Sequence, residues 1–223
     1  MITIIELEFP PDYQPRGPQS RTLRGAICEI DPGNPLLCQR DSDGKFLYRY
    51  PQVQYRWDIN RHRGILVGFL EGSDYLLNMR LTGRTLRLGE DEVPIIGTQI
   101  NTTLLEFSQS DTLRRYRFLS PWSPLDGDSF AKYSRMSKDD RAKLLDQRAR
   151  NHLVSAMRDL GCHPDWQVTA SVHVEETAPC RYKESTSLMG VWGTLVCNVN
   201  LPEGFAFGRK VSYGFGWIGV NGG

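Results

Sequence analysis

Several features that would assign a function directly are missing from this sequence of 223 residues. No stretch approaches the roughly 20 consecutive apolar residues that a membrane-spanning helix needs. The first residues include an early acid and no basic region, unlike a secretory signal peptide. We therefore expect a cytoplasmic protein that has no membrane partner.

The patterns that bind metals and nucleotides are missing too. The five cysteines are scattered and never spaced as C-x-x-C, and the four histidines form no H-x-x-x-H pair. Such spacings are typical of zinc sites, and even sets of cysteines are typical of disulfide frameworks. Neither G-K-[ST] nor G-x-G-x-x-G occurs. The sequence therefore predicts no metal, no cofactor and no disulfide framework.

Charge is balanced, with 27 Lys and Arg against 26 Asp and Glu, so the net charge of the chain does not favour a polyanionic partner. Nucleic-acid binding would depend on local clusters, because basic side chains must lie where the phosphates run. One such cluster extends from Gln39 to Arg63. It holds six basic residues against three acids, the basic ones being Arg40, Lys45, Arg49, Arg56, Arg61 and Arg63.

Hydrophobic periodicity in the first half predicts short strands and helices. Ile5, Leu7 and Phe9 alternate with Glu6 and Glu8, which is typical of a half-buried strand. The further elements that we expect are helices over residues 22–30 and 73–81, strands over 46–57 and 65–70, and short strands up to 118. In strand 46–57 one solvent-facing side would carry Tyr48, Tyr50, Gln52, Gln54 and Arg56, a surface that could stack bases or one in which tyrosine merely suits a strand.

The second half contains the clearest helix of the sequence. Ser137 with Asp140 forms a capping-box variant, small apolar residues recur at helical spacing to Leu160, and Gly161 ends the run. Its basic side chains, Arg148 among them, suit either RNA contact or a solvated surface. Strands are expected over 166–174 and 188–199, and residues 204–218 are rich in glycine.

The order of these elements indicates an α+β protein with antiparallel sheets. Two tandem ferredoxin-like (RRM-like) domains satisfy it. Two prolines, a glycine and an aspartate fall between Pro121 and Gly127, which marks this segment as the boundary. The expected domains are residues 1–120 and residues 128–223, the second ending in the glycine-rich segment.

That segment, from Leu201 to Ile218, combines glycines with Arg209 and Lys210, and glycine lets a backbone approach phosphates closely. It resembles the glycine-rich loop and last strand of the Cas6 family, the CRISPR repeat-processing endoribonucleases. Four blocks of the first half resemble the N-terminal domain of one Cas6 subgroup: Leu23–Ile27, Leu36-Leu37, Asp43–Tyr55 and Gly68–Gly72.

The resemblance implies a protein that binds CRISPR repeat RNA and cuts it without metal. The 2′-hydroxyl attacks the adjacent phosphate and leaves a 2′,3′-cyclic phosphate. Other effector subunits and a second copy of the chain, forming a homodimer, are further partners that the resemblance allows. The RNA-binding residues that we predict are Arg49, Tyr50, Arg56, Arg148, Gly208, Arg209, Lys210, Ser212, Tyr213, Gly214 and Gly216.

The sequence departs from the family where catalytic histidine is expected, just after the Leu-Leu pair. Cys38 and Arg40 occupy those positions. One hypothesis is that Arg40, Lys45 and Tyr48 form the catalytic set and stabilise charge at phosphorus. Cleavage would then be slow, because losing acid–base catalysis costs about 10²–10⁴ in rate. A second is a catalytically silent subunit that holds the repeat. A third is a scaffold that contacts only protein.

Overall fold

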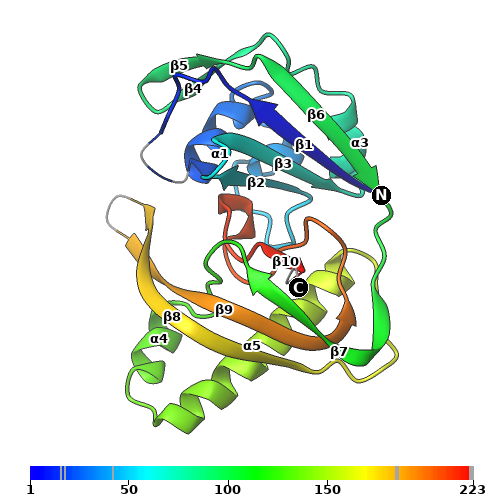
Figure 1. Cartoon of the computed structure of the whole chain (residues 1–223), viewed down its shortest axis with the longest axis vertical. Coiled ribbons are helices and arrows are strands. Elements are labelled where there is room, and N and C mark those ends of the chain that lie inside the picture. Colours follow the sequence, from blue (N-terminus) through cyan, green and yellow to red (C-terminus); the bar gives the residue numbers. More distant parts are fainter. Residues whose placement is uncertain (16, 18, 42, 184–185, 221–223) are drawn as a thin grey trace. The chain divides into compact units, whose positions relative to one another are not determined.

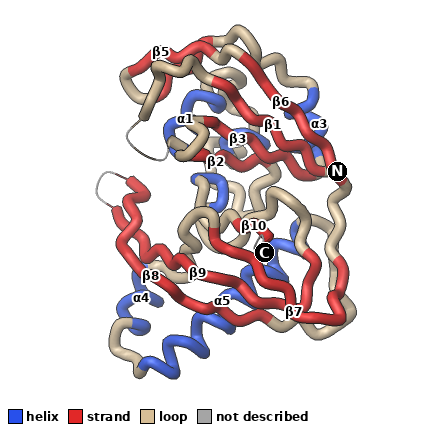
Figure 2. Tube along the Cα trace, viewed as in Figure 1, coloured by secondary structure: helices blue, strands red, loops and turns tan. Residues whose placement is uncertain are grey.

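The computed structural model describes residues 1–15, 17, 19–41, 43–183 and 186–220. The chain divides into two compact units. The first holds Met1–Leu105 together with Ser212–Gly214, and the second holds Glu106–Val211 and the chain from Phe215 onward. Each unit contains a four-stranded antiparallel sheet (Figures 1 and 2). None of the helices in the described part of the chain has the length and apolar character needed to cross a membrane.

The first unit has the β-α-β-β-α-β order of a ferredoxin-like fold. Its sheet runs β2-β3-β1-β6 with antiparallel neighbours, and β4 and β5 form a separate hairpin. The elements are β1 (Ile2–Glu8), α1 (Ser20–Cys28), α2 (Pro35–Cys38), β2 (Val53–Asp58), β3 (Arg63–Phe69), α3 (Glu71–Leu77), β4 (Thr85–Leu88), β5 (Asp91–Pro94) and β6 (Gly97–Thr103).

The alternation predicted for the first strand is confirmed. Ile5 and Leu7 are buried in the core that β1 shares with α1 and β2. On the opposite face, the Arg63 guanidinium forms ion pairs with the Glu6 and Glu8 carboxylates, at 2.8 and 2.9 Å. Apolar burial on one face and charge on the other fix the register of this strand.

The strand predicted over 46–57 is wrong in extent and in exposure. Regular pairing begins only at Val53. Pro51 has no backbone N–H to donate, so the ladder starts after it. Gln54 and Arg56 are 0% and 1% exposed, and the solvent-facing side expected of this strand does not exist. Residues 39–41 and 43–52 lie in a loop instead.

The second unit repeats the same order of strands. Its sheet runs β10-β7-β9-β8, again antiparallel, so both units are ferredoxin-like. The elements are β7 (Ser108–Phe118), α4 (Gly127–Tyr133), α5 (Lys138–Asp159), β8 (Ala170–Lys183), β9 (Thr186–Asn200) and β10 (Ile218–Val220). The 3₁₀ turn η1 (Val211–Tyr213) precedes β10, and its last two residues belong to the first unit. The two tandem ferredoxin-like domains predicted from the sequence are confirmed.

Between β9 and β10 the glycine-rich segment stands where the first unit has α3. Within the described residues, the only regular element between these two strands is the 3₁₀ turn η1. The segment expected as the domain boundary, Pro121–Gly127, lies inside the second unit, because β7 precedes it and pairs with β9 and β10.

The helix α5 begins as its sequence predicts. The Ser137 hydroxyl accepts the Asp140 amide at 3.2 Å and donates to its carboxylate at 2.7 Å. The helix ends just before Gly161, whose φ is +85°. The strand expected over 166–174 is shifted, because β8 starts at Ala170 and continues to Lys183 through Pro179. Proline is tolerated there because β8 is an edge strand.

Candidate functional site

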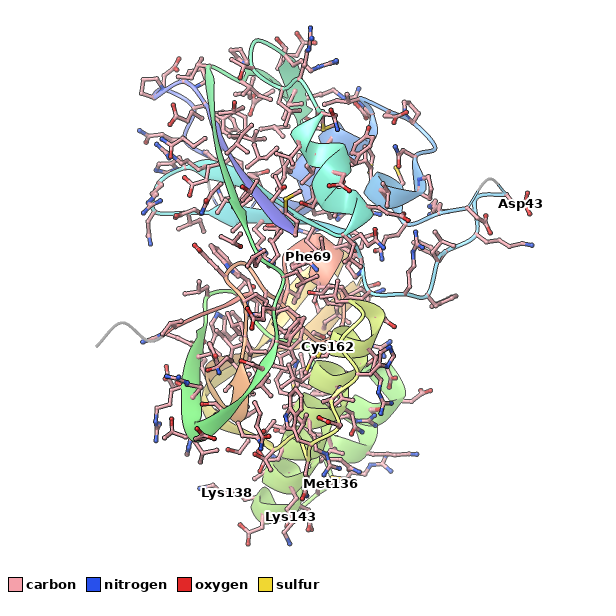
Figure 3. All side chains as sticks on the ribbon, turned by 90° about the vertical axis from the view of Figure 1, so that its right-hand side faces the viewer. Asp43, Phe69, Met136, Lys138, Lys143 and Cys162 are labelled. Atoms are coloured by element: carbon pink, nitrogen blue, oxygen red, sulfur yellow. The ribbon has the colours of Figure 1, made fainter. Side chains whose placement is uncertain are left out.

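The loop after α2 carries the three residues predicted to be catalytic. Asn34 caps α2 by accepting the Leu36 amide at 3.0 Å, and Gln39, with φ +53°, ends the helix. Asp41 Oδ1 then accepts the amides of Asp43 and Lys45, at 3.0 and 2.8 Å. These bonds fold the loop into a tight turn, with Asp43 at its outer end (Figure 3).

Within this loop the candidate catalytic side chains differ in how firmly they are held. The Arg40 guanidinium donates to the Gly44 carbonyl at 2.7 Å and lies 4.2 Å from the centre of the Phe46 ring. Lys45 is highly exposed and lies 3.9 Å from the Asp43 carboxylate. Tyr48 is 99% exposed. The structure therefore puts the three residues on one solvated loop, with only Arg40 oriented by its neighbours.

The base of the loop is anchored to the core of the first unit. Arg24, on α1, donates to the Cys38 carbonyl at 2.6 Å, and the Tyr55 hydroxyl donates to the Leu37 carbonyl at 3.1 Å. Cys28 contacts Cys38, and burial followed by this contact raises the pKa of the Cys28 thiol to about 12. That thiol is therefore protonated at neutral pH and is a poor nucleophile.

Arg24 also reaches the glycine-rich segment. Its guanidinium lies 4.6 Å from the centre of the Tyr213 ring and 3.4 Å from the Tyr213 hydroxyl. Ser212 is buried beside it, and Gly214 has φ +89°. A Cβ at Gly214 would lie 2.5 Å from Ser20 Oγ, so the chain passes α1 here only because the residue is glycine.

The other glycines of the segment lie in the second unit, and packing explains them. A Cβ on Gly208 would lie 2.5 Å from Trp122 Nε1, and one on Gly216 would lie 2.0 Å from the Phe207 carbonyl oxygen. Next to Gly208, Arg209 donates its amide to the Ser123 carbonyl at 3.2 Å. Lys210 follows with φ +62° and is half-buried.

Charged groups from different parts of the second unit gather near Gly208. The Arg209 side chain is 43% exposed and pairs with the Asp126 carboxylate at 3.5 Å. The amide and hydroxyl of Ser129 lower the pKa of Asp126, and Arg209 and Arg148 lower it further. The structure thus brings together Arg148, Arg209 and Gly208, three of the residues predicted to bind RNA.

His152 belongs to this cluster and was missed in the sequence. It lies one turn after Arg148 on α5, and its ring meets Trp122 edge to face at 6.0 Å. Burial, followed by the charges of Arg148 and Arg209, lowers the pKa of His152 to about 4. The four-residue spacing from Arg148 was the only local signal, and such spacing is common on helices.

Two residues predicted to bind RNA are covered in the structure. Tyr50 is 8% exposed and meets Phe69 edge to face at 5.8 Å. Arg56 is 1% exposed and donates to Gln54 Oε1 at 2.7 Å, and burial lowers its pKa to about 9. The sequence predicts both on a solvent-facing side of a strand, and the fold buries that side. Arg49 is exposed on the loop, as expected.

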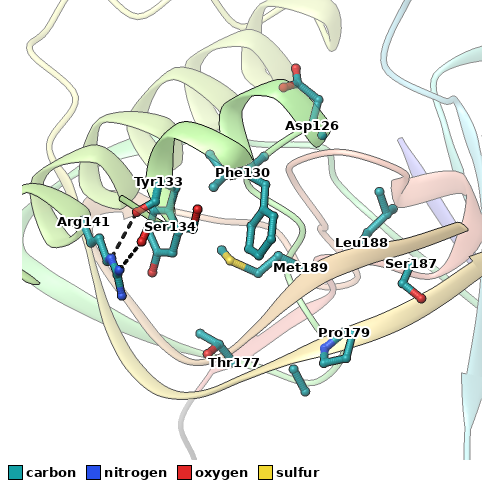
Figure 4. A pocket seen from close by; sticks show the side chains of 13 residues that line it. Asp126, Phe130, Tyr133, Ser134, Arg141, Thr177, Pro179, Ser187, Leu188 and Met189 are labelled. Carbon is teal, nitrogen blue, oxygen red and sulfur yellow. Dashed lines mark hydrogen bonds between the residues drawn. The ribbon is translucent and has the colours of Figure 1, made fainter. Parts of the chain in front are cut away.

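A separate hollow lies in the second unit between α4, the start of α5 and the β8–β9 pair (Figure 4). It measures about 500 Å³ and is mostly apolar, with Phe130 and Met189 facing it. Arg141 at its rim donates to the carbonyls of Tyr133 and Ser134, at 3.1 and 2.7 Å. This cation therefore caps α4. Among the described residues no three His, Cys, Asp or Glu side chains come close enough to hold a metal ion.

Comparison with known proteins extends these observations. The family model of the Cas6b N-terminal domain matches residues 1–114, and that of the Cas6b C-terminal domain matches residues 108–220. A solved structure described as Cas6b is 21% identical, with a TM-score of 0.86, over 98% of this chain and 99% of that chain. Another, described as the CRISPR RNA processing endoribonuclease Cas6b, is 20% identical, with a TM-score of 0.73, over 97% of each.

A sequence relative, an uncharacterized protein of Methanocaldococcus jannaschii, is 26% identical over 135 residues, which are 60% of this chain and 91% of the relative. The two family models, by contrast, leave almost no part of the chain unmatched. The resemblance seen in the glycine-rich segment and in the N-terminal blocks is thereby confirmed. The chain belongs to the Cas6b family.

Proposed function

We propose that this chain binds the repeat of CRISPR precursor RNA and cuts it without a metal ion. The 2′-hydroxyl oxygen attacks the adjacent phosphorus, the bond from phosphorus to the 5′ oxygen breaks, and the products carry a 2′,3′-cyclic phosphate and a 5′-hydroxyl. Family membership supports the substrate class, because a structural relative is described as a CRISPR RNA processing endoribonuclease.

The observation that carries the proposal is the exposed loop with Arg40, Lys45 and Tyr48, anchored at its base by Arg24 and Tyr55. Negative charge builds on the phosphate oxygens as the 2′ oxygen attacks. Fixed cations stabilise that charge more in the transition state than in the ground state, which is what accelerates the reaction. Arg40 is suited to this because its guanidinium is already oriented by Gly44 and Phe46.

A second candidate function is a silent subunit that holds the repeat within an effector complex. The observation favouring it is the same loop, because no histidine lies on it and the Arg40 guanidinium is engaged by its own turn. The cluster of Arg148, Arg209 and Gly208 would serve RNA binding in either case. A homodimer and contacts with other effector subunits stay predictions.

Incubation with end-labelled cognate repeat RNA in EDTA tests the proposal. We expect one cut with a cyclic-phosphate end. Replacing Arg40 and Lys45 together by alanine should slow single-turnover cleavage about 10²-fold, because two charges near phosphorus are lost. Affinity should change only a few-fold. The control is Arg87→Ala, an exposed arginine of the same unit that pairs with Glu29 at 3.0 Å, which should cut at the wild-type rate.

The other outcomes separate the remaining functions. RNA that is bound with a steep salt dependence and stays intact would establish the silent subunit. RNA that is not bound at low salt would leave only a scaffold of protein contacts. Equal cleavage by the wild type and the double variant would remove Arg40 and Lys45 from the mechanism.

A further inference from the structure

The proposed reaction needs a proton for the leaving 5′ oxygen, and the loop offers no well-placed donor. An acid must be held within hydrogen-bond reach of the atom that it protonates. Tyr48 is 99% exposed and the Lys45 side chain is 77% exposed, so solvent rather than protein surrounds the Tyr48 hydroxyl and the Lys45 ammonium. Arginine is effectively never deprotonated, which excludes Arg40 as a donor. A proton donor from another part of the first unit is therefore required.

Tyr213 meets this requirement better than any residue of the loop. It is half-buried, so its ring is fixed while part of the side chain stays accessible. Its hydroxyl lies 3.4 Å from the Arg24 guanidinium, which also covers the ring at 4.6 Å. Gly214, which fits against Ser20 only because it lacks a Cβ, fixes the backbone immediately after it.

Arg24 connects this tyrosine to the loop that carries Arg40, Lys45 and Tyr48. One of its terminal nitrogens contacts Tyr213, and the other donates to the Cys38 carbonyl at 2.6 Å, two residues before Arg40. One guanidinium thus joins Tyr213 to the loop, although Arg24 and Tyr213 are 189 positions apart in the sequence. The phenolate left after proton donation would form beside this positive charge, which stabilises it.

We propose, on the basis of the cleavage function above, that Tyr213 is the proton donor of the reaction and that Arg24 positions it. The 2′ oxygen bonds to phosphorus and its proton passes to solvent water. The bond from phosphorus to the 5′ oxygen breaks, and that oxygen takes the proton of the Tyr213 hydroxyl. Tyr213 then regains a proton from water, so no other reactant is consumed.

The test compares Tyr213→Phe on two repeat RNAs, one natural and one with sulfur in place of the bridging 5′ oxygen at the cut. A thiolate leaves without protonation, because a thiol has a pKa of about 8.5. We expect Tyr213→Phe to cut natural RNA about 10²-fold more slowly and the sulfur RNA within a few-fold of the wild type. Arg24→Lys should show only part of this rescue, because Arg24 also anchors the loop through the Cys38 carbonyl.

The control is Arg21→Ala, an exposed arginine on the same helix, which should match the wild type on both RNAs. A Tyr213→Phe variant that is equally slow on both RNAs would overturn the proposal, because its defect would then be structural. If Tyr213→Phe cut natural RNA at the wild-type rate, the proposal would be overturned as well, and the nuclease function would stand. Failure of the wild-type protein to cut either RNA would overturn both.

Discussion

Gly216→Ala is expected to destabilise the second unit by about 3 kcal/mol. Gly216 has φ +70°, which costs free energy for any residue with a Cβ, and the added carbon would lie 2.0 Å from the Phe207 carbonyl oxygen. The backbone cannot move away easily. The Gly216 amide donates to the Pro121 carbonyl at 2.9 Å, and the Gly216 carbonyl accepts from the Phe207 amide at 3.1 Å.

Scanning calorimetry should show this as a drop of about 10 °C in the melting temperature. The matched control is Gly25→Ala, in helix α1, where an added Cβ meets no atom within 4 Å and φ is not positive. That change should raise stability by about 0.5–1 kcal/mol, because alanine favours helix. An unchanged melting temperature for Gly216→Ala would show that the segment around it rearranges freely.

Mild acid should destabilise the second unit through His152. The pKa of His152 is about 4 in the folded protein, against 6.5 in an unfolded chain, so the unfolded state binds the proton more tightly. The stability that is present above pH 6.5 is therefore lost as pH falls towards about 4. The gap between the two pKa values corresponds to about 3 kcal/mol.

Chemical unfolding at a series of pH values measures this loss, and His152→Asn should flatten the curve between pH 6.5 and 4. The neighbouring charges support the assignment. The lowered pKa of Asp126, the carboxylate of this cluster, places its titration below this range. His163→Asn, at an exposed position, serves as the matched histidine control. Equal curves for His152→Asn and the wild type would show that His152 does not titrate abnormally.

The sequence predicts best the features that depend on near neighbours. The capping box of Ser137 and Asp140 and the alternation of Ile5 and Leu7 need only a few adjacent residues, and both are as expected. The ferredoxin-like order also follows from local periodicity, because short connections leave few ways to pair the strands.

Burial and long-range contacts explain what the sequence could not predict. Arg56 alternates like a solvent-facing residue, yet it is 1% exposed, and that depends on what covers the sheet. The contact between Arg24 and Tyr213 joins positions 189 apart and leaves no local pattern. The residues around His152 in the sequence have the composition of an ordinary helix surface. Its neighbour Trp122 precedes α4 in the sequence, whereas His152 follows it.

The irregularity of β8 has a consequence for solubility. An exposed sheet edge is a template on which another chain can add a strand and aggregate. Along β8 the register shifts twice, between Val174 and Glu176 and between Arg181 and Lys183, and Pro179 has no amide hydrogen to offer. Glu175 and Glu176 add exposed negative charge to the same strand. These features make β8 a poor template, so we do not expect a homodimer to form by pairing strand with strand along β8.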